Sequence, residues 1–151
     1  MTQLSQIEAD RLLKVAKRAE NTSAYCYPPS PGERLETVLT ATTGHERFFL
    51  TAWKSLNIQG KLTYQTREGN HIVLARLDCG AEHRNPNGER IGSPHLHLYR
   101  EGYGDTWAIE LPNSKYADFD NATSDLDWLD SFLKFCNIDR GILGFEELAL
   151  K

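Results

Sequence analysis

The segment from Leu77 to Leu111 carries most of the side chains that could do chemistry. Three of the five histidines, His83, His95 and His97, lie in it together with arginines, turn residues and aromatic rings. An imidazole can bind a metal ion, transfer a proton near neutral pH or hydrogen-bond to an anion. We therefore expect the functional site within this segment.

The most specific feature is the strand-like run from His95 to Tyr99. Alternate residues of a strand share a face, so His95, His97 and Tyr99 should point to one side. The two leucines between them should face the core. Two imidazoles on one face are spaced to share a divalent transition metal. A third ligand could come from the loop or the hairpin: His83, Asp78, Glu82 or Asp105.

The same region could instead receive a small anionic ligand, such as a phosphate or a carboxylate. Arg84 offers planar, paired donors, and it is a better candidate than Arg100, which alternation places on the core-facing side. Aromatic rings nearby could stack on a base or a sugar. The candidate binding residues, for such a ligand or for a protein partner, are His83, Arg84, Asn85, His95, His97, Tyr99, Tyr103 and Trp107.

Two further interpretations stay open. In the first, the histidines only hydrogen-bond to the loop, and Pro94 marks an edge strand on which another protein docks. In the second, His95 and His97 serve a phosphodiester hydrolase or nuclease, with or without a metal ion. An enzyme requires at least two of the histidines to converge with an arginine or a carboxylate in a concave site, whereas a binding module requires only an exposed patch.

The composition narrows the function classes. The net charge is −4 and no cluster of lysines and arginines dominates, which argues against nucleic-acid binding. Neither a phosphate-binding glycine loop nor a serine in a nucleophile elbow is present in the sequence. The apolar runs are too short for a membrane span, and three cysteines without a CxxC motif fit a reducing compartment. We therefore expect a cytoplasmic protein.

The elements that must position the histidines are predicted from the alternation and from helix caps. The length fits one domain, residues 1–151, in three parts. Residues 1–32 should form a helix from about residue 5 to 20 and a proline-rich connector. Residues 33–111 alternate apolar and polar side chains in three successive hairpins, with a long connection at 78–94. Residues 112–151 contain a capping box at Ser124, a helix with one apolar face and a tail.

The predicted fold class is α+β. Connections as short as those of the three hairpins join antiparallel neighbours, so the strands should form a meander of about six strands. The N-terminal helix and the C-terminal helix should pack on one face of this sheet, because each has an apolar stripe to bury.

The string HRNPNGERIGSPHLHLYREGYGDTWAIELP, followed by a helix that ends in FLKFCNI, carries a resemblance over residues 77–138. Its most specific parts are NPNG at 85–88, PHLH at 94–97 and EGY at 101–103. It resembles a family of small bacterial and prophage proteins that is classed only as a domain of unknown function. The resemblance implies a bacterial, cytoplasmic setting, often on a mobile element, and it supplies no activity and no catalytic residue.

Overall fold

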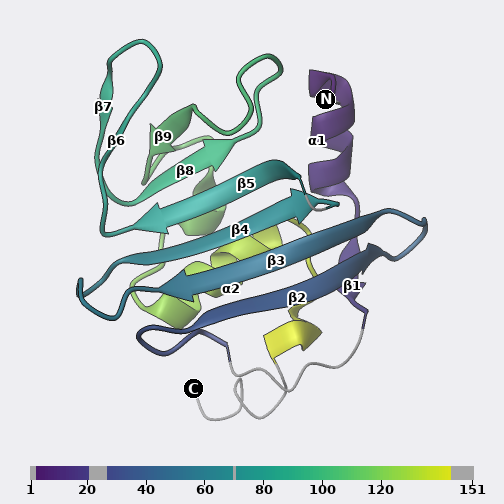
Figure 1. Cartoon of the computed structure of the whole chain (residues 1–151), viewed down its shortest axis with the longest axis horizontal. Coiled ribbons are helices and arrows are strands. Elements are labelled where there is room, and N and C mark those ends of the chain that lie inside the picture. Colours follow the sequence, from purple (N-terminus) through teal and green to yellow (C-terminus); the bar gives the residue numbers. More distant parts are fainter. Residues whose placement is uncertain (1–2, 21–26, 70, 144–151) are drawn as a thin grey trace.

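The computed structural model describes residues 3–20, 27–69 and 71–143, which build a large antiparallel sheet and two α-helices (Figure 1). Seven strands follow the spatial order β1-β2-β3-β4-β5-β8-β9, and β6 and β7 form a separate small sheet. The strands are β1 Lys17–Ala19, β2 Arg34–Ala41, β3 Arg47–Lys54, β4 Leu62–Glu68, β5 Ile72–Cys79, β6 His83–Arg84, β7 Arg90–Ile91, β8 His95–Leu98 and β9 Ala108–Glu110. The helices are α1 Gln6–Lys14 and α2 Asp125–Phe135, with 3-10 turns η1 Ala117–Phe119 and η2 Arg140–Leu143.

The alternation of the strands explains how the sheet forms its core. In β3, Phe48, Leu50 and Ala52 are completely buried on one face. Because side chains of a strand alternate, these buried side chains of β3 lie on the same side of the sheet, while Phe49 and Trp53 lie on the other. All pairs in the large sheet are antiparallel. The predicted α+β fold and its three hairpins are confirmed, and the short strand β1 makes seven strands where about six were expected.

The helix α2 covers the apolar face of the sheet (Figure 1). Ser124 caps its N-terminus in a reciprocal capping box with Asp127, as the sequence predicts. Leu129, Phe132 and Leu133 are completely buried, and burial of such a side chain stabilises the fold by about 1.5–3 kcal/mol. No helix among the described residues covers the opposite side of the sheet, which we call the open face.

The N-terminal helix is shorter than predicted. α1 ends at Lys14, and residues 17–19 form β1, which pairs with β2. The spacing of Ala16 and Ala19 also fits a helix, so the local pattern misled the prediction. Lys17 is only 1% exposed, and its ammonium group donates hydrogen bonds to carbonyls at the ends of both helices. Residues 21–26 of the connector and 144–151 of the tail lie outside the described residues.

The long connection after β5 folds into the small sheet. β6 and β7 pair around the NPNG turn, in which Gly88 has a φ of 91°, a value that glycine adopts without strain. The amide of Asn85 donates to the carbonyl oxygen of Ala108 at 2.9 Å and accepts from its backbone N–H at 2.8 Å. The hairpin is thereby fastened to β9, and this attachment holds His83 against the large sheet.

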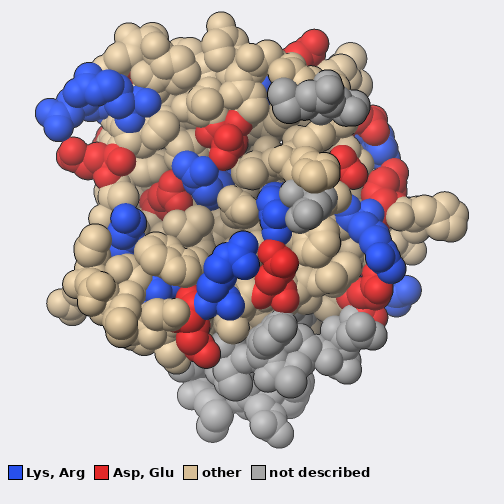
Figure 2. Space-filling view, in the orientation of Figure 1, with Lys and Arg blue, Asp and Glu red and all other residues tan. Residues whose placement is uncertain are grey.

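The register places the polar side chains of the open face in two cross-strand rows. Figure 2 shows charged side chains of both signs across the middle of this face. Residues directly opposite each other in antiparallel strands have Cβ atoms about 4.5–5.5 Å apart, so members of a row are neighbours. The first row is Arg34, Trp53, Thr63, Asp78, His95 and Glu110, and the second is Glu36, Thr51, Gln65, Arg76, His97 and Ala108.

Candidate metal centre

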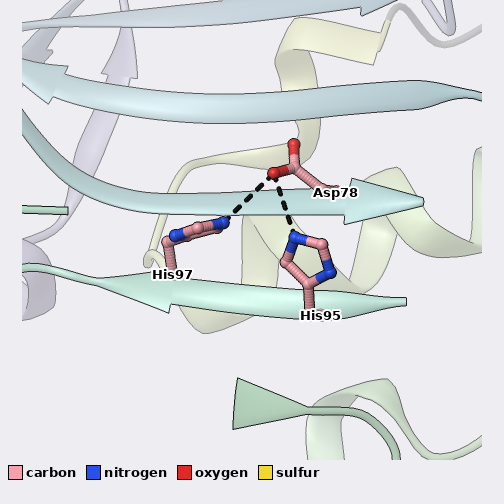
Figure 3. Close-up of side chains that lie close together, drawn as sticks. All are labelled: Asp78, His95 and His97. Atoms are coloured by element: carbon pink, nitrogen blue, oxygen red, sulfur yellow. Dashed lines mark ion pairs between the residues drawn. The ribbon is translucent and has the colours of Figure 1, made fainter. Parts of the chain in front are cut away.

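Asp78, His95 and His97 meet on the open face at the junction of β5 and β8 (Figure 3). Asp78 lies directly opposite His95, and His97 follows two residues later on the same side of its strand. The carboxylate Oδ2 of Asp78 is 3.3 Å from Nε2 of His95 and 3.2 Å from Nε2 of His97. All three donor atoms lie within 4.8 Å of one another, so one metal ion could contact them together.

The other ring nitrogen of each histidine faces a backbone carbonyl. Nδ1 of His95 lies 3.1 Å from the carbonyl oxygen of Gly92, and Nδ1 of His97 lies 2.7 Å from that of Asp105. A carbonyl oxygen can only accept a hydrogen bond, so the proton of each neutral ring resides on Nδ1. Both Nε2 atoms therefore present a lone pair to the carboxylate of Asp78, which is itself an acceptor.

Arg76 and Thr63 supply donors to part of this cluster. The guanidinium of Arg76 donates through Nε to Oδ2 of Asp78 at 3.1 Å, and its NH2 group lies 3.0 Å from Nε2 of His97. The hydroxyl of Thr63 donates to Oδ1 of Asp78 at 2.8 Å. Among the described residues, no donor reaches Nε2 of His95. A proton on this nitrogen, or a metal ion shared with the carboxylate, would make the contact between His95 and Asp78 favourable.

The cluster is almost closed to solvent. The side chains of His95 and His97 are 2% and 0% exposed, and that of Asp78 is 15% exposed. Burial acts to raise the pKa of the Asp78 carboxyl, but the hydrogen bonds that the two histidines donate when Nε2 carries a proton, the charge of Arg76 and the hydroxyl of Thr63 hold this pKa well below its usual range. Asp78 is therefore an ionised carboxylate at neutral pH.

His83 covers the two buried histidines without joining their donor atoms. Its ring centroid is 4.5 Å from that of His97 and 5.7 Å from that of His95. Its Nε2 donates to the carbonyl oxygen of Thr106 at 2.8 Å. The three histidines of the predicted segment do converge, and Asp78 alone of the four suggested third ligands stands with the pair.

The other predicted site residues lie away from the cluster. Arg84 is exposed and donates to the carbonyl of Gly88 within its own hairpin, at 2.9 Å. Tyr99 follows the end of β8, where the alternation stops, and its hydroxyl bonds to backbone atoms of Leu4. Tyr99 therefore packs in the core and does not share the face of the histidines. Asn85 has the fastening role described above.

The predicted aromatic residues form a separate group beside the turn after β8. The rings of Tyr103 and Trp107 meet edge to face, with centroids 5.9 Å apart, and the guanidinium of Arg100 lies 4.2 Å from the centre of the Trp107 ring. Tyr103, Trp107 and Arg100 thus contact one another, and their side chains form no hydrogen bond or ring contact with the described histidines of the cluster. The arginine that does contact the histidines is Arg76, which the sequence analysis missed although it stands two residues before Asp78.

The fold and this cluster define an α+β protein with a buried carboxylate and two histidines on the uncovered face of its sheet. The chain belongs to a family of unknown function, DUF6978, whose model matches residues 4–138. This match includes the whole cluster and confirms the predicted membership of a domain family of unknown function. No curated protein and no solved structure matches the chain. Among the described residues, no helix is long and apolar enough to cross a membrane.

Proposed function

We propose that the protein binds one divalent first-row transition-metal ion through Asp78, His95 and His97 and presents it to a small anionic ligand on the open face. The observation that carries this proposal is the convergence of Oδ2 of Asp78 with Nε2 of His95 and Nε2 of His97, at 3.3 and 3.2 Å. Histidines that bind metals use the other ring nitrogen to donate to a backbone carbonyl or a carboxylate. Both His95 and His97 have that arrangement.

The spacing between Asp78 and each histidine fits the coordination of one metal ion. Two ligands about 2.05 Å from a tetrahedral ion lie roughly 3.3 Å apart, which matches the separations of 3.3 and 3.2 Å between Asp78 and the two histidines. A proton on His95 would satisfy one contact, whereas a metal ion satisfies three. Binding moves the NH2 group of Arg76 off His97, while the bond of its NH1 group to Asp105, 2.9 Å long, can hold the guanidinium nearby.

Metal stoichiometry tests the proposal. Purified protein is dialysed against chelator, titrated with Co²⁺ and Zn²⁺, and analysed for bound metal and for the visible spectrum of bound cobalt. We expect one equivalent in the wild type, and its loss in Asp78→Asn and in His95→Gln. His71→Gln, which changes an exposed histidine outside the cluster, is the matched control and should still bind one equivalent. Failure of the wild type to retain metal would contradict the proposal.

A second candidate function is metal-dependent hydrolysis of phosphodiesters. Three protein ligands leave a coordination position for water, whose pKa a bound ion lowers toward neutrality. Arg76 stands beside this position, and its NH2 group, once it has left His97, can donate to a phosphate. Convergence of the histidines with a carboxylate and an arginine is the feature that an enzyme requires. Hydrolysis of bis(p-nitrophenyl) phosphate by the Zn²⁺-loaded or Mn²⁺-loaded wild type, absent in Asp78→Asn, would establish this activity.

Pro94 does not mark an edge strand, because β8 lies between β5 and β9 and the edge of the sheet is β9. Docking of a protein along β9 receives less support. An edge strand captures a partner through free backbone groups, but the N–H and carbonyl of Ala108 are already bonded to Asn85. The side chain of Glu110 in turn accepts from the backbone N–H of Gly92 at 2.8 Å. The hairpin of β6 and β7 therefore occupies part of the edge that a partner strand would need.

A further inference from the structure

A groove with a volume of about 450 Å³ lies on the open face next to the metal centre. Asp78 and Arg76 form one end of it, and Arg34, Trp53 and Lys61 are among the residues that line the rest. Since His95 and His97 are buried, the carboxylate of Asp78 is the part of the cluster that this groove reaches. A ligand in the groove would thus approach the metal ion from the side of Asp78.

The first cross-strand row forms the floor of the groove. Trp53, Thr63 and Asp78 stand opposite one another on β3, β4 and β5. Neighbouring strands are about 4.8 Å apart, so the Trp53 ring begins roughly 10 Å from the carboxylate. The indole of Trp53 is partly exposed, and it offers a flat apolar surface on which a planar ring can stack.

Positive charge surrounds this surface. The Nζ atom of Lys61 is 5.9 Å from the centre of the Trp53 ring, and no carboxylate among the described residues forms an ion pair with it. Arg34 stands opposite Trp53 with a side chain that is 58% exposed, and its one ion pair, to Glu36, is 3.6 Å long. Three cations and one carboxylate therefore line the groove, and a bound metal ion adds positive charge at the Asp78 end.

We infer that the groove binds a nucleoside phosphate, with its base stacked on Trp53 and its phosphate directed to the metal ion and Arg76. Such a ligand carries a planar ring at one end and an anionic group at the other. The Trp53 end of the groove can stack on the ring, and the Arg76 end can bind the anionic group. Lys61 and Arg34 lie beside the base and hold further negative charge. This inference rests on the proposed metal centre for the phosphate end, and on Trp53 for the other end.

Binding of AMP to the Zn²⁺-loaded protein, measured by calorimetry, tests the inference. We expect Trp53→Leu to weaken AMP binding by about 10-fold, since stacking of a base on an aromatic ring contributes about 1–3 kcal/mol. Trp128→Leu, which removes a partly exposed aromatic ring on α2 outside the groove, is the matched control and should leave AMP binding unchanged. Adenosine, which lacks the phosphate, should bind at least 10-fold more weakly than AMP.

Metal content measured on the same samples separates the two proposals. If the wild type and Trp53→Leu both hold one zinc ion and only the wild type binds AMP tightly, the inference is supported. If zinc is bound but AMP binds no better than inorganic phosphate, or Trp53→Leu has no effect, the nucleotide inference is wrong and the metal centre stands. If no zinc is bound by the wild type, the metal centre and the inference built on it both fail.

Discussion

Lys17 and Asp78 are two buried charged groups on opposite sides of the sheet, and they differ in how their hydrogen bonds are satisfied. The ammonium of Lys17 has three N–H donors and meets three carbonyl oxygens, those of Leu13, Val15 and Cys136, at 2.8, 3.0 and 2.7 Å. These carbonyls lie at the C-terminal ends of α1 and α2, where partners are missing and where a positive charge is favourable. Donors and acceptors match.

Around Asp78 the acceptors exceed the donors. Arg76 and Thr63 serve the carboxylate and His97, but His95 directs a lone pair at the same oxygen with no donor among the described residues. Buried polar groups of folded proteins are nearly always paired, so the contact between His95 and Asp78 calls for a proton or a metal ion on Nε2 of His95. Lys17 thus has a structural role, because all its donors are paired within the fold. The Asp78 cluster can bind a ligand, because a further cation would satisfy its acceptors.

The largest effect is expected from Lys17→Met. The substitution fills the space but leaves three carbonyls without a donor, and each unsatisfied buried group costs about 1–3 kcal/mol. We expect the free energy of unfolding in urea to fall by about 3 kcal/mol or more. Lys14→Met, which changes an exposed lysine at the end of α1, should change it by less than about 0.5 kcal/mol. Equal effects of both substitutions would contradict the proposed role of Lys17.

A bound metal ion should stabilise the folded protein only when Asp78 is present, whether or not Lys17 is replaced. A ligand at about 100 times its dissociation constant adds roughly 2.7 kcal/mol to a folded protein, or roughly 5–10 °C in melting temperature at this chain length. We expect Zn²⁺ to produce this rise in the wild type and in Lys17→Met, and no rise in Asp78→Asn. Thermal unfolding with chelator and with Zn²⁺ measures it. A similar rise in Asp78→Asn would place the zinc elsewhere.

The pH dependence of the free energy of unfolding should report the burial of Lys17. Burial lowers the pKa of Lys17 from 10.5 to about 8. Between these values the unfolded chain binds more protons than the folded one, so the contribution of Lys17 to the free energy of unfolding rises with pH. Its three carbonyl partners offset part of the burial penalty, so we expect a rise of about 1–3 kcal/mol.

The rise is measured as the difference between the wild type and Lys17→Met in urea unfolding at pH 8 and pH 10. This difference reports Lys17 together with its charge interaction with Cys136, whose pKa burial raises to about 12. The wild type should gain relative to the variant as the pH increases. A difference that stays constant, or shrinks, would show that burial does not lower the pKa of Lys17.

The smallest effect is expected from Thr63→Val, which removes the hydroxyl that holds Oδ1 of Asp78. Loss of this hydrogen bond should lower the free energy of unfolding by about 1 kcal/mol. Residues that hydrogen-bond to a metal-binding side chain hold it in the orientation for binding, so loss of the Thr63 hydroxyl should also lower the affinity for Zn²⁺ by about 10-fold or more. Thr40→Val, on the open face of β2 outside the groove, is the control and should leave zinc affinity unchanged in calorimetric titration.

Much of the fold could be predicted because its signals are local. Period-two alternation specifies which side chains of β2, β3, β4, β5 and β8 share a face, and short turns specify antiparallel hairpins. The N-cap at Ser5 and the capping box at Ser124 also lie within four residues of sequence. The strand β1 was missed because its burial depends on Lys17 reaching the end of α2, a contact between residues 17 and 136 that no local pattern contains.

The candidate site, like the fold, has a part that local sequence predicts and a part that depends on long-range strand pairing. The sequence by itself determined that His95 and His97 point to one side of a strand, since alternation follows from backbone geometry alone. Only the tertiary structure decided that Asp78 is their partner, because that depends on the register of β5 with β8 across the intervening hairpin. The same register brought Arg76 to His97, while Arg84, close to the histidines in sequence, was turned away into the hairpin. Pairing between strands is a long-range choice, made by burial of the whole apolar face rather than by any single motif.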